Sequence, residues 1–163
     1  PAGCAPSLLV IHNISLPPGC YGDDCIELFF CNCLNPRRHP YFEEIRDLRV
    51  SAHLLVRRDG ALLQFVNLDD RAWHAGQSHF EGRDNCNDFS IGVELEGSDD
   101  EAFPPEQYGR LAALTNTLLA HYPDLSPTRI VGHSDIAPGR KTDPGPFFDW
   151  SRYRSLLANT GET

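Results

Sequence analysis

Apolar residues along the chain gather in short runs that predict β-strands. The segment from Ser7 to Ile14 (S-L-L-V-I-H-N-I) is nearly continuous in apolar residues, which is typical of a strand buried on both faces. We expect two further strands, from Phe89 to Glu96 and from Arg129 to Val131. Asp59-Gly60 stands between the segments Val50–Arg58 and Ala61–Val66, and this dipeptide is a strong signal for a β-hairpin.

Helical periodicity is clearest in the last third of the chain. Pro104-Pro105 opens a segment in which apolar residues recur every three or four positions, and we assign this stripe to core packing. The stripe consists of Tyr108, Leu111, Ala112, Thr115, Leu118, Leu119 and Tyr122. A second helix is expected around Asp24 to Cys33, and a third after Asp149, whose side chain suits an N-cap.

Alternating strands and helices with one hairpin predict an α/β fold, in which a mixed central β-sheet is flanked by helices. The chain has 163 residues, of which 40% are hydrophobic, and this size suits one compact domain. No internal repeat or low-complexity linker interrupts it. We therefore expect residues 1–163 to form a single domain.

Composition narrows the classes of partner. The formal net charge of -9 argues against nucleic-acid binding, which needs clustered Lys and Arg. No apolar run approaches the ~20 residues that cross a bilayer, so no membrane partner is expected. Pro1 to Val10 lack the charged start and cleavage site of a secretory signal, and we expect a cytoplasmic protein.

Six cysteines are many for a chain of this length. They are Cys4, Cys20, Cys25, Cys31, Cys33 and Cys86. Cys31 and Cys33 are separated by one residue, whereas a zinc ribbon uses two to four, and no second pair follows. We expect reduced thiols, while a disulfide and a metal or redox role remain alternatives.

Two histidines follow predicted strands directly. His12 ends the first apolar run, and His133 follows Val131-Gly132. Ligands in α/β folds usually bind at the carboxyl ends of the strands, where such side chains lie. Taken alone, each histidine is more often a buried residue with a hydrogen-bond partner than a ligand.

The segment Lys141-Thr142-Asp143-Pro144 adds a charged pair. Residues two apart in extended backbone point to the same side, and the proline favours that conformation at Asp143. A carboxylate together with two imidazoles would leave one zinc coordination position open, as in catalytic sites. Lys141 would then stand near the same centre.

The strand from Phe89 to Glu96 carries a candidate base. Its apolar residues share one face, and Gly92, Glu94 and Glu96 share the other. A glutamate on a covered face is costly without a partner, so Glu94 is either a general base or half of a structural ion pair. Glu96 is expected to be an ion-pair or hydrogen-bond partner.

A chain-wide resemblance connects these features. It rests on V-I-H-N-I-S-L-P-P-G (10–19), H-P-Y-F (39–42), L-R-V-S-A-H (48–53), R-A-W-H-A-G (71–76), C-N-D-F-S-I-G-V-E-L-E-G (86–97) and G-H-S-D-I-A-P-G-R-K-T-D-P-G (132–145). Over roughly residues 7 to 158 the chain resembles the AmpD family, cytoplasmic anhydro-N-acetylmuramyl-L-alanine amidases of bacterial cell-wall recycling that are linked to β-lactamase regulation. The resemblance implies the amidase fold shared with peptidoglycan recognition proteins and phage lysozyme-type amidases.

The resemblance also implies a set of site residues. One Zn²⁺ would be held by His12, His133 and Asp143, with Glu94 and Lys141 as catalytic residues. Asn13, Arg49, Trp73 and His74 would contact the substrate, and His74 would hydrogen-bond near the metal. The substrate would be a small soluble muropeptide cut between N-acetylmuramic acid and L-alanine, by an enzyme that we expect to be monomeric.

Several alternatives remain at this stage. The most serious is a periplasmic amidase that acts on intact peptidoglycan. A non-catalytic peptidoglycan-binding module is a second, although such modules typically lack a zinc ligand. A cysteine peptidase with Cys86 as nucleophile is disfavoured because that residue precedes a strand and does not open a helix. A redox or metal sensor would use the cysteines between 20 and 33.

Overall fold

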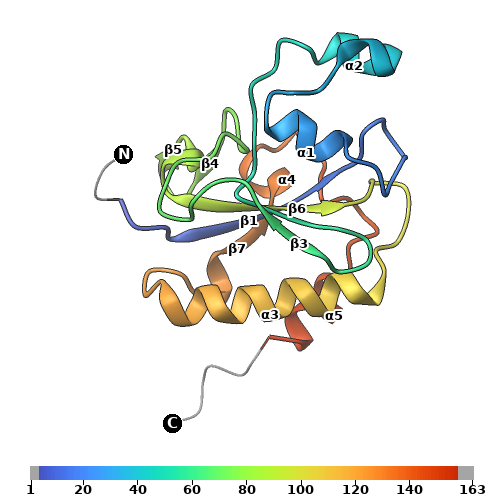
Figure 1. The fold of residues 1–163 in the computed structure, drawn as a ribbon. Coiled ribbons are helices and arrows are strands. Elements are labelled where there is room, and N and C mark those ends of the chain that lie inside the picture. The colour runs from blue at the N-terminus through green and yellow to red at the C-terminus, as the bar shows by residue number, and fades with distance from the viewer. Residues whose placement is uncertain (1–3, 158–163) are drawn as a thin grey trace.

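A sheet of five strands forms the centre of the protein, as the computed structural model shows (Figure 1). The strands are β1 (Leu8–Ile14), β2 (Leu54–Val56), β3 (Leu62–Gln64), β6 (Ser90–Glu96) and β7 (Ile130–Gly132), in the order β3-β2-β6-β1-β7. Neighbours are parallel except for β3, which runs antiparallel at one edge, so the predicted mixed α/β sheet is confirmed. The structure describes residues 4–157, and positions 1–3 and 158–163 of the expected domain lie outside them.

Helices cover both faces of this sheet. Helices α3 (Pro105–His121) and α5 (Trp150–Ser155) lie on one face, while α1 (Cys25–Phe30), α2 (Pro40–Glu44) and α4 (His133–Ile136) lie on the other (Figure 1). A small hairpin, β4 (His79–Phe80) with β5 (Arg83–Asp84), and three 3₁₀ turns complete the fold. The turns span Pro36–Arg38, Cys86–Asp88 and Pro127–Arg129.

The main apolar core lies between the sheet and α3. Alternate residues of β1 and β6 point into it, among them Leu9, Ile11 and Val93, which are at most 1% exposed. The predicted stripe of α3 meets them and is buried, apart from Leu119, which is partly buried. The carboxylate of Asp149 accepts a hydrogen bond from the backbone of Arg152, so the predicted cap of α5 is confirmed.

The remaining residues of β1 and β6 face the opposite side. Leu8 and Val10 pack there in a smaller apolar cluster, whereas the carboxyl-terminal halves of both strands carry polar residues. The alternation predicted for the strand from Phe89 to Glu96 is thus confirmed. One face builds the core and the other is available for a site.

Some elements are shorter than predicted. The helix expected over residues 24–33 ends at Phe30, because Asn32 adopts a left-handed backbone with φ of 58°. The amides of Asn32 and Cys33 then donate back to the carbonyls of Phe29 and Leu28, at 3.0 and 2.7 Å, which closes the helix. The predicted hairpin forms, but its strands have three residues each.

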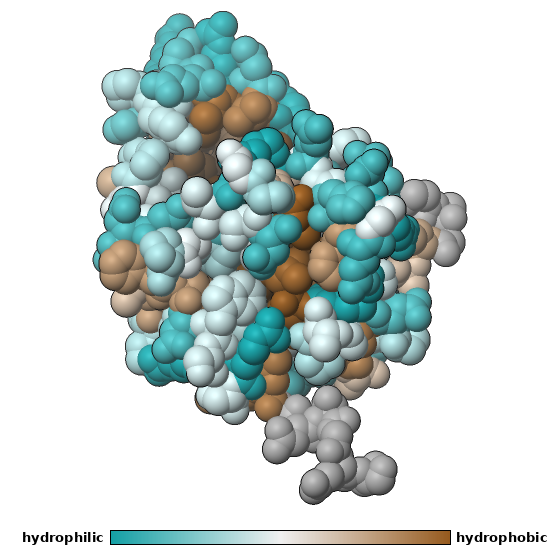
Figure 2. Space-filling view, turned by 180° about the vertical axis from the view of Figure 1, so that it is seen from behind, coloured by the Kyte–Doolittle hydropathy of each residue, from teal (hydrophilic) through white to brown (hydrophobic). Residues whose placement is uncertain are grey.

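The outer surface is mainly hydrophilic in the view of Figure 2, where hydrophobic residues gather beneath the projecting α2 segment and in a narrow central band. Between residues 4 and 157 no helix has the length and apolar character needed to cross a bilayer. All six cysteines are unpaired in this structure.

Candidate metal and catalytic site

The register of three parallel strands brings the predicted site residues together. In the sheet His12 pairs with Glu94, and the preceding residue Ile11 pairs with Gly132. His133 follows Gly132 as the first residue of α4, so it lies beside His12. Paired residues of neighbouring strands point to the same face, and the imidazole of His12 and the carboxyl of Glu94 therefore share one side of the sheet.

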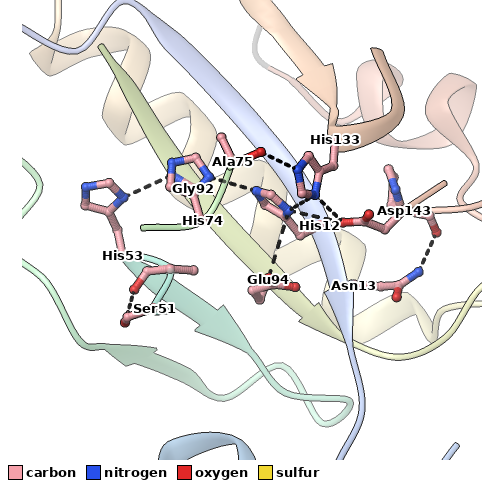
Figure 3. Close-up of polar contacts among 12 residues, drawn as sticks. His12, Asn13, Ser51, His53, His74, Ala75, Gly92, Glu94, His133 and Asp143 are labelled. Carbon is pink, nitrogen blue, oxygen red and sulfur yellow. Dashed lines mark hydrogen bonds and ion pairs between the residues drawn. The ribbon is translucent and has the colours of Figure 1, made fainter. Parts of the chain in front are cut away.

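Three side chains converge on a single point (Figure 3). The Nδ1 atoms of His12 and His133 are 3.0 Å apart, and Asp143 Oδ2 lies 3.1 and 3.2 Å from them. Both histidines are almost fully buried, at 1% and 4% exposure. The sequence predicted these three residues as one ligand group, and the structure places their ligand atoms together.

Asp143 reaches this point because its loop is tied to the sheet. The side-chain amide of Asn13 donates to the carbonyl oxygen of Pro144 at 3.0 Å and to Asp99 Oδ1 at 2.7 Å. Asp99 Oδ2 in turn accepts from the hydroxyl of Thr142. The carbonyl of Asp143 also accepts from the amide of Ser134 at 3.0 Å, and these bonds hold the loop on both sides.

The donor set fits a zinc ion. His133 Nε2 donates to the carbonyl oxygen of Ala75 at 2.9 Å, which leaves Nδ1 of the neutral ring as a bare lone pair. One carboxylate oxygen and two imidazole nitrogens lie in mutual contact with their lone pairs facing one another. A cation bound between them would offset the repulsion between these lone pairs. Two imidazoles and one carboxylate, with no fourth protein ligand in this group among residues 4–157, are the composition of a catalytic zinc site.

Burial keeps the ligands in the form that a metal needs. Desolvation lowers the pKa of His12 to about 4, although hydrogen bonding to Asp143 opposes this shift. Burial by itself would raise the pKa of Asp143, but the adjacent imidazoles of His12 and His133 hold that pKa below its usual range. At neutral pH His12 is thus uncharged and Asp143 is ionised, and protons compete little for the site.

Glu94 differs from the ligands in its electrostatics. Its Oε1 lies 3.9 Å from His12 Nδ1, and its Oε2 is buried with no hydrogen-bond partner among residues 4–157. Burial raises the pKa of Glu94 well above its usual value, and the charge of Asp143 adds to this while Lys141 opposes it. A carboxyl whose pKa is raised in this way keeps a proton more readily than an ordinary glutamate, which suits a general acid–base.

Lys141 supplies positive charge at the mouth of the site. It is exposed, it lines the same cleft as Glu94, and its charge lowers the pKa of both Glu94 and His12. The amide of Lys141 donates to the carbonyl of Ala137 at 3.0 Å, and residues 141–143 belong to no β-strand. The loop that carries Lys141 and Asp143 is held at the site by the hydrogen bonds of Asn13 with Asp99 and Pro144.

The site opens into a cleft of about 700 Å³. The metal group lies on one side, and the other side is lined by Phe29, Phe30, Tyr41, Ile45, Leu48 and Val50. Trp73 is 56% exposed at the cleft, with the guanidinium of Arg71 4.0 Å above its ring. The exposed Arg49 also lines the cleft, so the expected substrate contacts lie around one opening.

Two residues important to this geometry had not been expected. Asp99 anchors Asn13 and the loop that carries Asp143, and Arg140 donates to the carbonyl oxygens of Ala75 and Gln77 at 2.6 and 2.7 Å. Both lie in irregular segments, where no periodic pattern shows which way a side chain points. The position of Arg140 beside Lys141 is the one signal that the sequence offers.

Cys86 does not have the environment of a nucleophile. It is fully buried, and burial raises the pKa of its thiol, whereas a reactive cysteine needs an exposed thiolate. His53 is also buried: its Nδ1 accepts from the amide of Gly92 and its Nε2 donates to the carbonyl of Asp70, so both nitrogens are used by the backbone. Neither residue belongs to the ligand group.

Comparisons with known proteins agree with this geometry. The chain matches the N-acetylmuramoyl-L-alanine amidase family over residues 2–146. It is 58% identical over 153 residues to the 1,6-anhydro-N-acetylmuramyl-L-alanine amidase AmpD of Salmonella typhimurium, covering 94% of this chain and 81% of the relative. The crystal structure of a selenomethionine AmpD derivative is 56% identical with a TM-score of 0.92, covering 94% and 85% of the chains.

A more distant structure contains a substrate. The complex of the amidase AmiD from Escherichia coli with anhydro-N-acetylmuramic acid-L-Ala-D-gamma-Glu-L-Lys is 28% identical, with a TM-score of 0.69. The match covers 96% of this chain and 60% of that chain.

Proposed function

Because this chain belongs to the N-acetylmuramoyl-L-alanine amidase family, we propose that it is a zinc enzyme that hydrolyses the amide between 1,6-anhydro-N-acetylmuramic acid and L-alanine. The observation that carries the proposal is the convergence of His12, His133 and Asp143 beside Glu94, a buried carboxyl with a raised pKa. The product would be a free peptide for cell-wall recycling.

The group of His12, His133 and Asp143 would bind the catalytic metal. His12, His133 and Asp143 would hold one zinc ion, and the neutral imidazole of His12 and the ionised carboxylate of Asp143 need lose no proton for it at pH 7. When bound there, zinc supplies Lewis-acid chemistry, which makes water acidic enough to attack an amide near neutral pH.

Glu94 would move the protons of the reaction. Its unpartnered Oε2 accepts a proton from the attacking water and delivers it to the leaving nitrogen of L-alanine, which would otherwise depart as an unstable anion. The positive charge of Lys141 favours the ionised form of Glu94, which the base step requires. The buried setting keeps the protonated form accessible for the acid step.

Lys141 would stabilise the charge that develops on the amide oxygen. Its ammonium lines the cleft that contains Glu94 and the ligand group, and a donor aimed at an oxyanion is worth roughly 3–4 kcal/mol in comparable sites. Asn13, Arg49, Trp73 and His74 line the same cleft and would surround the substrate. Arg49 suits a peptide carboxylate, because its guanidinium can bind in a bidentate manner.

The size of the cleft favours a small soluble substrate. A volume of about 700 Å³ lies within the range of sites for small molecules, and its apolar wall can cover one side of a sugar or peptide. We place the enzyme in the cytoplasm as a monomer, and its six unpaired thiols accord with a reducing compartment. A role in β-lactamase regulation would follow from removal of the anhydro-muropeptide.

The test compares two substrates under two metal conditions. Zinc-loaded and chelated protein are incubated with purified anhydro-muropeptide and with intact sacculi, and products are identified by mass spectrometry. We expect zinc-dependent release of intact peptide from the soluble substrate and slow release from sacculi. Equal or faster release from sacculi would favour an amidase of intact wall, and binding without cleavage would favour a non-catalytic module.

A further inference from the structure

We infer that His74 and Ser90 are positioning residues that fix the tautomer of His12 and so present its Nδ1 lone pair to the metal. The inference deepens the proposed function, since it concerns the same zinc site. It assigns a role to two residues that are not ligands and to a glycine, Gly92, over which His74 lies. Figure 3 shows the bond between His74 and His12 that this role depends on.

The chain of hydrogen bonds begins at a group that can only accept. The hydroxyl of Ser90 lies 2.6 Å from the carbonyl oxygen of Cys86, and a carbonyl has no hydrogen to donate. The single hydroxyl hydrogen of Ser90 is therefore used in that bond. Any other hydrogen bond at Ser90 Oγ must be one that the oxygen accepts.

The next two bonds then have only one possible direction. Ser90 Oγ lies 3.1 Å from His74 Nε2, so that nitrogen must carry the hydrogen of the His74 ring. A neutral imidazole has one N–H, which leaves His74 Nδ1 as an acceptor, 2.9 Å from His12 Nε2. His12 Nε2 is therefore the donor, and His12 Nδ1 faces His133 and Asp143 as a bare lone pair.

The two ligand histidines are fixed in different ways. His133 donates directly to a backbone carbonyl, that of Ala75, which any side chain at that position would provide. His12 depends instead on the side chains at positions 74 and 90. Substitutions at positions 74 and 90 should therefore change the zinc affinity through His12 and leave the hydrogen bond of His133 intact.

The fold is shaped to hold the His74 ring in this place. A Cβ at position 92 would lie only 2.4 Å from His74 Cγ, so only glycine allows the ring to pass over β6. Side-chain Oδ1 of Asn87 accepts from the amides of His74 and Ala75 at 3.0 and 2.8 Å, which anchors the backbone. The ring then meets His12 edge-on, with centroids 5.0 Å apart and planes at 90°.

The expected size of the effect follows from comparable sites. Hydrogen bonds that orient a ligand histidine are typically worth 10–100-fold in metal affinity or activity. Removal of the acceptor at His74 should therefore weaken zinc binding roughly 10–100-fold, and removal of the Ser90 hydroxyl about 10-fold. These losses concern binding of the metal itself, and not only turnover.

The experiment measures zinc dissociation constants by competition with a chromophoric chelator. The variants are His74→Leu, which removes the acceptor; His74→Asn, whose side-chain oxygen can accept from His12 in its place; and Ser90→Ala. His121→Leu and Ser155→Ala, both exposed and far from the cleft, are the matched controls. Thermal melts of the chelated proteins establish that each variant is folded.

We expect weaker binding in His74→Leu and Ser90→Ala, recovery in His74→Asn to within about threefold of wild type, and no change in the controls. Nitrogen-15 NMR of metal-free protein should show the His12 hydrogen on Nε2 in wild type, and a loss of this preference in His74→Leu. The inference is overturned if the three site variants bind zinc within twofold of wild type, or if wild type carries the hydrogen on Nδ1.

The result also separates this inference from the proposed function. If wild type fails to bind zinc, the proposed function fails, while the NMR tautomer of metal-free His12 still decides the inference. If His74→Leu does not fold, Ser90→Ala and His74→Asn carry the comparison. A variant that binds zinc normally but loses turnover would contradict the positioning role and assign the residue to substrate or chemistry.

Discussion

Glu94→Gln separates acid–base chemistry from metal binding. Glutamine keeps the shape of the side chain but cannot take up a proton, and Glu94 Oε1 is 3.9 Å from the nearest ligand nitrogen, His12 Nδ1. Positioned general acid–base catalysis contributes about 10²–10⁴-fold to turnover, and kcat should fall by about this factor. That loss corresponds to about 3–5 kcal/mol in the activation barrier, while zinc content should stay the same.

The same substitution should stabilise the metal-free protein. Burial, helped by the charge of Asp143, raises the pKa of Glu94 in the folded state above its unfolded value. A raised carboxyl pKa contributes stability below the unfolded pKa of about 4.3, and this contribution is lost as pH rises through the folded pKa. Wild type should therefore lose stability with rising pH relative to Glu94→Gln, so that the gap is wider at pH 8 than at pH 5.

The assay combines three measurements on one pair of proteins. Peptide release from anhydro-muropeptide gives kcat, metal analysis gives zinc content, and urea unfolding with a chelator at pH 5 and pH 8 gives stability. Glu44→Gln, at an exposed position of α2, is the matched control and should behave as wild type. Turnover within tenfold of wild type, a loss of zinc, or a stability gap that does not change with pH would contradict the role of Glu94 as a buried general acid–base.

Three further predictions test the ligands and the core. Asp143→Asn should weaken zinc binding by more than about 100-fold, because a ligand is worth more than the bonds that orient one; chelator competition checks this. Leu111→Ala, a fully buried position of α3, should cost about 2–5 kcal/mol in urea unfolding without lowering kcat at 25 °C, since it lies across the sheet from the site. In metal-free protein the lowered His12 pKa, about 4, contributes stability above its unfolded value of about 6.5. About 3 kcal/mol should be lost as pH falls between these values, and the His12→Asn variant should lack that slope in urea unfolding.

Local periodicity predicted the framework of the fold well. The apolar run of β1 and the helical stripe of α3 each bury a continuous face. The spacing of apolar residues was therefore enough to predict both elements. The alternation along β6 also separated the core face from the face that carries Glu94. Element ends were less predictable, because Asn32 closes α1 through its own backbone conformation.

The arrangement of the site depends on contacts that no local pattern encodes. The pairing of Ile11 with Gly132 sets His12 beside His133 across more than a hundred residues of chain. Asp143 joins them because Asn13 and Asp99 hold its loop against the sheet. The three ligands could be identified as a group only through resemblance to a family, whereas the hydrogen-bond chain behind His12 required coordinates.

The most direct test of the zinc site is a titration of chelated protein with zinc, in which bound metal and peptide release from anhydro-muropeptide are followed together. We expect both to rise in parallel and to reach a plateau at one zinc per chain. His133→Ala, which removes one ligand, should give neither signal over the same zinc range. Full activity in the chelated protein, or unchanged zinc binding by His133→Ala, would contradict a catalytic zinc at this site.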